Sequence, residues 1–196
     1  ASTRLGFNVK RTMRVAQKLY EAGLITYMRT DAPSLSKDSI NEARSFIEKN
    51  IGEKYLTNAP RIYSSTENAQ EAHEAIRPTN AFLKAADVIN LSEEESKLYK
   101  LIWERFIGSQ LPDAEYLSTS AKIFIEENTF VAKGRELVFD GYTNVMSHSS
   151  NDENILPPLS DGDRIKKQDI NLDQKFTKPP SRFSEAALVR ELEKRG

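Results

Sequence analysis

The chain has 196 residues, with 28 lysines and arginines, 29 aspartates and glutamates, and no cysteine. This length can build one or two domains with their own apolar cores, and the lack of cysteine excludes a disulfide framework, a thiolate zinc site and a thiol nucleophile. A net charge of −1 argues against a uniformly basic coat for nucleic acid. No apolar run approaches the roughly 20 residues that span a bilayer, so we expect a soluble, cytoplasmic, monomeric protein without membrane contact.

The first predicted element is a helix over residues 8–22. Apolar residues recur there at helical spacing, and Gly23 follows as a residue that stops helices. Arg11, Arg14 and Lys18 fall three and four residues apart, so they share a helix face that can lie along a phosphate backbone. A solvated surface face is the other interpretation, and these three residues taken alone favour it.

Residues 24–28, LITYM, predict a short strand directly after this helix. Alternation along a strand would place Ile25 and Tyr27 on one face, so Tyr27 is either core packing or chemistry. A second helix is expected over residues 37–49, with Ser36 as its N-cap.

The middle of the chain predicts two further helices. Residues 69–76 favour a short helix that ends before a proline. Residues 92–110 show strong amphipathic spacing, and Ser92 with Glu95 forms a capping box. We expect Trp103 in this helix to be a packed core aromatic.

Beyond residue 112 the pattern changes to alternation of apolar and polar residues, which is typical of strands. A helix capped by Ser184 is expected at the end of the chain. The strands are expected over residues 118–126, 129–133, 136–139 and 164–171.

The chemistry that the residues support is narrow. Two histidines do not supply a set of zinc ligands, and no glycine-rich loop of the kind that cradles nucleotide phosphates is present. A phenol is a weak nucleophile unless its anion is stabilised, and Arg29, two residues after Tyr27, offers a lasting charge and a fork for phosphate oxygens. A tyrosine and an arginine at this spacing are nevertheless common in ordinary strands.

Three blocks of sequence carry a resemblance to a known family. They are LYEAGLITYMRTDA at residues 19–32, AQEAHEAIRPT at 69–79 and PPSRFSEAALVRELEKRG at 179–196. In this order they closely resemble bacterial type IA DNA topoisomerases, and Met28 after the tyrosine favours the topoisomerase I branch. One departure is Ala32, where the family usually has a serine whose hydroxyl would cap the local turn.

The resemblance implies a role for each matching residue. Tyr27 is expected to attack a phosphodiester of single-stranded DNA, giving a 5′-phosphotyrosyl link and a free 3′-hydroxyl, and to reseal it after strand passage without ATP. This cycle would relax negative supercoils. Arg29 would hold the scissile phosphate and His73 would contact a phosphate nearby.

Other residues of the blocks carry weaker implications. Arg77 and Glu74 could either serve DNA binding or fix their loop by ion pairing, and the sequence leaves both interpretations open. Thr30 and Asp31 are expected to orient the end of the strand or Arg29, because a bare carboxylate beside a phosphate would repel it.

The fold implied is α+β. A helical winged-helix-like domain is expected over residues 1–113, followed by a β-rich arch segment over 114–177 and the truncated start of a neighbouring helical DNA-groove domain over 178–196. The chain would then be a central fragment that is inactive alone. Magnesium would be held by a Toprim domain outside it, so the expected partners are single-stranded DNA and the rest of the polypeptide, in the bacterial nucleoid.

Two other classes of function stay open at this stage. The first is a noncatalytic winged-helix module that binds DNA through the basic face of the first helix. The second is a protein-interaction scaffold that binds neither form of DNA.

Overall fold

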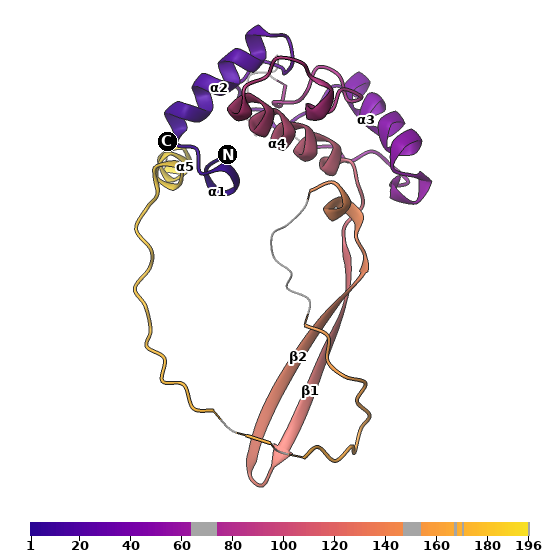
Figure 1. Cartoon of the computed structure of the whole chain (residues 1–196), viewed down its shortest axis with the longest axis vertical. Helices are drawn as coiled ribbons and strands as arrows, with labels where there is room; N and C mark the ends of the chain where they lie inside the picture. Colours follow the sequence, from indigo (N-terminus) through magenta and orange to yellow (C-terminus); the bar gives the residue numbers. More distant parts are fainter. Residues whose placement is uncertain (64–73, 147–153, 167, 170, 196) are drawn as a thin grey trace. The chain divides into compact units, whose positions relative to one another are not determined.

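The structure is a computed structural model (Figure 1). It divides into two compact units, of which unit 1 comprises Ala1–Ala114 and Phe139–Ser149, and unit 2 comprises Glu115–Val138 and Ser150–Gly196. The expected mixture of helix and strand is confirmed. The residues that the structure describes are 1–63, 74–146, 154–166, 168–169 and 171–195.

Unit 1 is built from helices whose starts follow local capping rules. The Asn8 side chain accepts a hydrogen bond from the backbone of Arg11, and Ser36 accepts one from Ser39. Ser92 and Glu95 form the predicted capping box. The α-helices are α1 (Ser2–Leu5), α2 (Val9–Glu21), α3 (Lys37–Asn50) and α4 (Glu93–Ser109), and the 3₁₀ helices are η1 (Glu53–Tyr55), η2 (Ala85–Asp87) and η3 (Gly141–Asn144).

Helix α4 is the central element of unit 1, because it contacts α2, α3, η2 and η3. Its N-terminal half gives Leu98 and Tyr99 to a core cluster shared with α2. Its C-terminal half gives Trp103 and Phe106 to a second cluster shared with α3. A single amphipathic helix therefore joins both cores of the unit.

The polar atoms of the α4 aromatics are satisfied in the core. Trp103 is buried, as predicted, and its indole nitrogen donates to the carbonyl of Ala81 at 2.8 Å. The Tyr99 hydroxyl donates to the carbonyl of Leu83 at 2.8 Å, and burial raises the pKa of Tyr99 to about 12.

The segment that begins at Phe139 belongs to unit 1 and packs within it. The rings of Tyr55 and Phe139 stack with centroids 5.2 Å apart, and the Tyr55 hydroxyl donates to Asp140 at 2.7 Å. Gly141 adopts a φ of 47°, and a Cβ there would collide with the backbone carbonyl of Asp113. Only glycine fits at this turn without moving the backbone.

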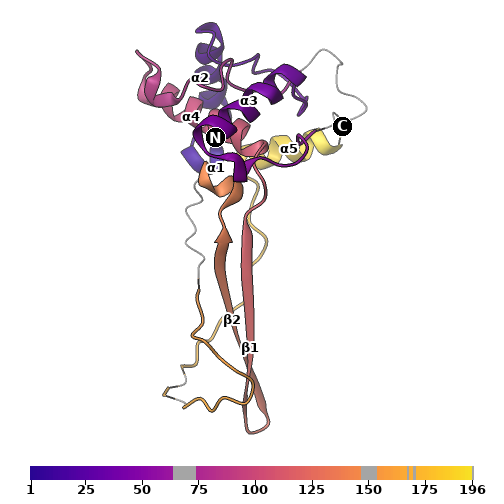
Figure 2. The same ribbon diagram turned by 90° about the vertical axis from the view of Figure 1, so that its right-hand side faces the viewer.

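Unit 2 contains a two-stranded antiparallel hairpin, β1 (Glu115–Ile125) and β2 (Asn128–Phe139), whose strands run side by side in Figure 2. The expected break at residue 134 is wrong, because Gly134 stays inside β2. A Cβ there would press on Asn154 and Leu156, so glycine serves a close approach of backbone and not a turn.

The strand expected over residues 164–171 is also wrong for the part of that range that the structure describes. Alternating apolar and polar residues predict which side chains would share one face of a strand. A strand forms only where another strand supplies hydrogen-bonding partners, and the described residues of 164–171 pair with no strand. The last helix, α5 (Glu185–Arg195), starts as predicted, with the Ser184 hydroxyl accepting from the backbone of Ala187 at 3.2 Å.

A winged-helix arrangement of unit 1 is not confirmed. In the described part of this unit the backbone outside the helices forms an isolated bridge between Ile25 and Pro78, where a wing would need a hairpin. Among the described helices none is long and apolar enough to cross a membrane.

Candidate functional site

The segment around Tyr27 is an extended connection and not the strand that alternation predicts. Ile25 and Met28 are its core residues, with exposed fractions of 1% and 4%. They lie three residues apart, so the period is not two, and pairing is limited to the single bridge from Ile25 to Pro78. The two buried anchors leave Tyr27 between them, where its side chain is 45% exposed.

The ring of Tyr27 lies against the end of α2. Its centroid is 5.2 Å from that of Tyr20, with the rings at 66° in an edge-on arrangement. The phenol oxygen forms no hydrogen bond with any residue in the described ranges. Tyr27 is therefore a surface tyrosine with a supported ring and a hydroxyl open to an incoming group.

The residues after Tyr27 leave a second group available. Arg29 is exposed, and its guanidinium makes no ion pair or hydrogen bond with another residue of the described chain. The hydroxyl of Thr30 accepts from the backbone of Ala32 at 3.1 Å, which closes the turn. Thr30 thus supplies a cap beside the position where the family's serine would stand, and Ala32 itself is buried.

The second block lies partly outside the described residues, and His73 belongs to the part that is not described. Its expected phosphate contact stays a prediction. Residues 74–77 are irregular and show no helix, so the part of the expected helix over 69–76 that can be seen is wrong. The reason is a tertiary contact, because the backbone of Ala75 donates to the carbonyl of Ser34 at 2.8 Å and so bonds to a segment far away in the sequence.

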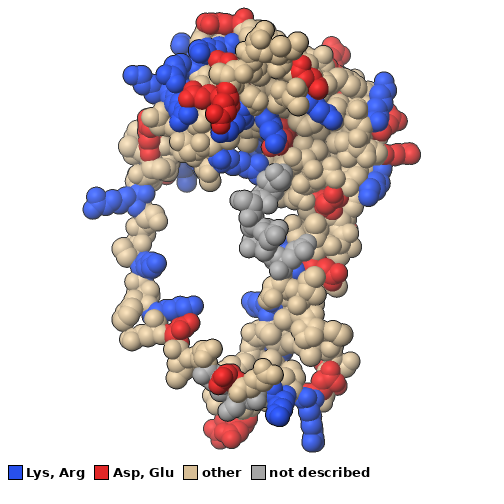
Figure 3. All heavy atoms as spheres, viewed as in Figure 1, with Lys and Arg blue, Asp and Glu red and all other residues tan. Residues whose placement is uncertain are grey.

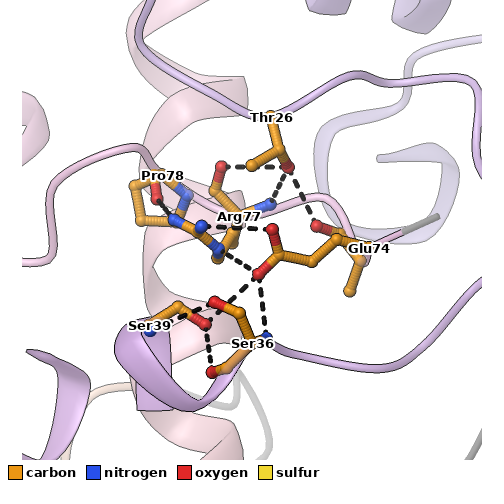
Figure 4. Close-up of polar contacts among 7 residues, drawn as sticks. Thr26, Ser36, Ser39, Glu74, Arg77 and Pro78 are labelled. Atoms are coloured by element: carbon orange, nitrogen blue, oxygen red, sulfur yellow. Dashed lines mark hydrogen bonds and ion pairs between the residues drawn. The ribbon is translucent and has the colours of Figure 1, made fainter. Parts of the chain in front are cut away.

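Glu74 and Arg77 form a two-pronged ion pair (Figure 4). Arg77 Nε lies 2.7 Å from one carboxylate oxygen of Glu74, and Nη2 lies 3.1 Å from the other. The third guanidinium nitrogen donates to the carbonyl of Pro78 at 3.0 Å, and the Arg77 side chain is only 15% exposed. The loop-fixing interpretation of this pair therefore describes its geometry, and a DNA contact by Arg77 stays a prediction.

The charge of Glu74 is held by its neighbours. Burial acts to raise the pKa of its carboxyl, but the hydrogen bonds from Arg77 and from the backbone of Ser36 outweigh that effect and lower it. Glu74 consequently remains a carboxylate and ties the loop to the start of α3.

Thr26 is the residue that the sequence alone did not single out. Its hydroxyl donates to the carbonyl of Ala75 at 2.8 Å and accepts from the backbone of Arg77 at 3.0 Å. Its backbone donates in return to the carbonyl of Arg77 at 2.9 Å. The sequence does show a threonine directly before the tyrosine, but threonine is so common in strands that its presence there indicates no particular role.

The basic face of α2 is engaged with the start of α4. Arg11 and Arg14 both reach Glu94, at 2.7 and 3.3 Å, and Lys18 reaches Glu95 at 3.2 Å. On the face drawn in Figure 3 basic and acidic side chains are interspersed over these helices. The three cations share a face, as the helical spacing predicts, and acids of the same unit lie beside them.

Comparison with known proteins identifies the family. The profile of a family described as DNA topoisomerase matches residues 1–196. The chain belongs to this family. The resemblance carried by the three sequence blocks is thus confirmed across the whole length of the topoisomerase chain.

Relatives of this topoisomerase chain agree with that assignment. It is 50% identical over its full length to DNA topoisomerase 1 of Pseudomonas aeruginosa and 49% identical to DNA topoisomerase 1 of Escherichia coli. Full-length topoisomerase I of Thermotoga maritima superposes on 99% of the chain with a TM-score of 0.79 at 33% identity. The chain spans 23% of the length of the two bacterial relatives and 32% of the Thermotoga structure.

No group of three or more acidic or histidine side chains in the described part of this topoisomerase chain lies close enough together to hold a metal ion. What the site does present is an exposed phenol, a neighbouring exposed guanidinium without a partner among the described residues, and the hydrogen bonds of Thr26 beside them.

Proposed function

We propose that this chain is the tyrosine-bearing part of a type IA DNA topoisomerase and that Tyr27 is its nucleophile. The observation that carries the proposal is the exposed Tyr27 phenol two residues from the exposed Arg29, in a chain that belongs to the topoisomerase family. A fully buried phenol could not approach a phosphodiester.

The proposed reaction is an exchange of one phosphate ester for another. The Tyr27 oxygen forms a bond to phosphorus, its proton is lost, and the 3′-oxygen of the neighbouring nucleotide leaves as a hydroxyl after taking up a proton. The 5′-phosphotyrosyl link keeps the ester, so resealing needs no ATP. Passage of the other strand between the two steps relaxes negative supercoils.

Arg29 is proposed to hold the scissile phosphate. Its planar fork offers two parallel donors to the non-bridging oxygens, where negative charge develops during attack. His73 and Arg77 are proposed DNA contacts, with Arg11, Arg14 and Lys18 along the backbone of the strand. Thr30 and Asp31 would orient the turn that presents Arg29.

Magnesium is proposed to bind outside this chain, in a Toprim domain of the longer protein, where it would offset phosphate charge. The described residues include no group of three or more acidic or histidine side chains close enough together to hold a metal ion. Every step above is assigned to Tyr27, Arg29 and the DNA. The same proposal places the whole protein in the bacterial cytoplasm, at the nucleoid.

A trapping experiment on the full-length protein tests the nucleophile. Labelled single-stranded DNA is incubated with the protein and quenched with detergent, and protein-linked label is counted. Tyr27→Phe should reduce the linked DNA to background, because only the attacking oxygen is removed. Tyr116→Phe, which removes the hydroxyl of another exposed tyrosine, should trap as much DNA as the unaltered protein.

Covalent DNA on the Tyr27→Phe protein would overturn the proposal. If the unaltered protein binds DNA and never becomes linked to it, the noncatalytic DNA-binding module becomes the better function. Duplex and single-stranded probes in a filter-binding assay then describe that module.

A further inference from the structure

We propose that Thr26, braced by the Glu74–Arg77 ion pair, is a positioning residue that holds Tyr27 in the orientation for attack on DNA. The inference rests on the proposed role of Tyr27. It assigns the hydroxyl of the residue before the nucleophile, and not its charged neighbours, as the group that fixes the nucleophile's backbone.

The Thr26 hydroxyl makes two short, directional bonds to one segment. It gives its single proton to the carbonyl of Ala75 at 2.8 Å and accepts the backbone proton of Arg77 at 3.0 Å. With the backbone bond from Thr26 to the carbonyl of Arg77 at 2.9 Å, three hydrogen bonds converge on the residue that precedes Tyr27. The position of the Tyr27 Cα follows from these bonds.

The partner segment is itself held in place. The guanidinium of Arg77 is gripped by both oxygens of Glu74, and Glu74 accepts from the backbone of Ser36 at 3.0 Å and from the hydroxyl of Ser39 at 3.3 Å. Figure 4 shows these side chains converging on Glu74 at the first turn of α3. A continuous polar path thus runs from α3 through Glu74 and Arg77 to Thr26.

The apolar and polar contacts fix different coordinates of Tyr27. Ile25 and Met28 are buried on either side and set how far the segment stands from the core. Apolar packing tolerates sliding and rotation, whereas hydrogen bonds are directional. The bonds of Thr26 therefore supply the orientation that burial leaves open.

Attack on phosphorus needs orientation at this level. A misplacement of about 1 Å can cost on the order of 100-fold in rate even when binding is unchanged. Loss of the Thr26 hydroxyl should accordingly slow the chemical step more than it weakens DNA binding.

The test uses a matched pair of substitutions in the full-length protein. Thr26→Val keeps the shape and removes the hydroxyl, while Thr26→Ser keeps the hydroxyl and removes a methyl group. Single-turnover cleavage of labelled single-stranded DNA and the Kd for the same DNA are measured for both. Thr26→Val should cleave about 10- to 100-fold more slowly with a Kd within about twofold, and Thr26→Ser should stay within about threefold of the unaltered protein in both.

A second variant keeps the test decisive if Thr26→Val fails to fold. Glu74→Gln preserves size and removes the charge that grips Arg77, so it should slow single-turnover cleavage at saturating DNA about 3- to 10-fold, whatever change the released Arg77 makes in the Kd. Where Thr26→Val folds, the double variant should lose less than the product of the two single effects, because both act through Arg77.

Three results would overturn the inference: cleavage by Thr26→Val at the unaltered rate, equal losses in Thr26→Val and Thr26→Ser, or a Glu74→Gln effect confined to Kd. Each of these can occur while Tyr27→Phe still abolishes trapping, in which case only the positioning role fails. Trapping by Tyr27→Phe would instead remove the proposed function on which the inference depends.

Discussion

The two arginines Arg77 and Arg29 have different roles, because their side chains have different partners. Arg77 is mostly buried and uses its guanidinium nitrogens on Glu74 and Pro78. Arg29 is exposed and has no partner among the residues that can be described. Because the protein already engages the Arg77 guanidinium, Arg29 is the stronger candidate for the clamp on the scissile phosphate.

The geometry of Arg29 leads to a prediction about its replacement by lysine. Arg29→Lys keeps the charge and loses the fork, so single-turnover cleavage of single-stranded DNA should fall by about 10-fold or more. The Kd for that DNA should rise only about twofold, because the charge that attracts the backbone is retained. The two quantities are measured on the full-length protein.

The control is Arg4→Lys, the same change at an exposed arginine of α1. It should leave cleavage unchanged. Equal cleavage by the Arg29→Lys and Arg4→Lys proteins would contradict a clamp that depends on the fork.

In the contact between α2 and α4, the acidic side chains at the start of α4 have two effects. The acids in the first turn of α4 stabilise that helix terminus, and they also neutralise the cations of α2 that the helical spacing places on one face. Exposed ion pairs of this kind contribute about 0–1 kcal/mol. The cations can therefore exchange Glu94 for a phosphate at little cost.

This exchange predicts the effect of removing the acid. Glu94→Gln releases Arg11 and Arg14, and the affinity for single-stranded DNA should rise about two- to fivefold at low salt, with the gain shrinking as salt increases. Fluorescence anisotropy with a labelled oligonucleotide measures it. Glu48→Gln is the matched control, since it removes the same charge from an exposed acid on another helix, α3. Equal affinities for the two variants would exclude Arg11 and Arg14 from the DNA path.

On the scale of the molecule, the chain is about a quarter of its bacterial relatives in length. Large apolar side chains of the hairpin such as Phe124 and Val138 are exposed, and the described residues contain no metal cluster. Because the chain spans only this share of its relatives, we propose that it supplies a nucleophile and a clamp and that the longer protein supplies the other parts of the reaction.

The corresponding prediction concerns the isolated 196-residue chain. With magnesium it should neither relax negatively supercoiled plasmid nor become linked to single-stranded DNA, whereas we expect the full-length protein to do both. Gel electrophoresis and detergent trapping provide the measurements. Magnesium-dependent relaxation by the pure chain would show that its own residues complete the site.

Helix starts and the family were accessible from the sequence because they depend on residues close together in the chain. Ser36 and Ser92 mark the starts of α3 and α4 by hydrogen bonds to backbone three residues on, and such bonds need no distant partner. The strand over residues 24–28 could not be judged in this way, because pairing depends on segment 75–79, about 50 residues further along the chain.

The amino-acid sequence by itself determined helices α2, α3, α4 and α5, the strand-rich character of the residues after 112 and membership of the topoisomerase family, and it placed Tyr27 and Arg29 two residues apart. Only the tertiary structure decided that Ile25 and Met28 are buried while Tyr27 faces out, that Arg77 serves Glu74, and that Thr26 joins the two blocks. The physical reason is that burial and hydrogen bonding across distant segments depend on which surfaces meet after folding, and local patterns carry no record of that meeting.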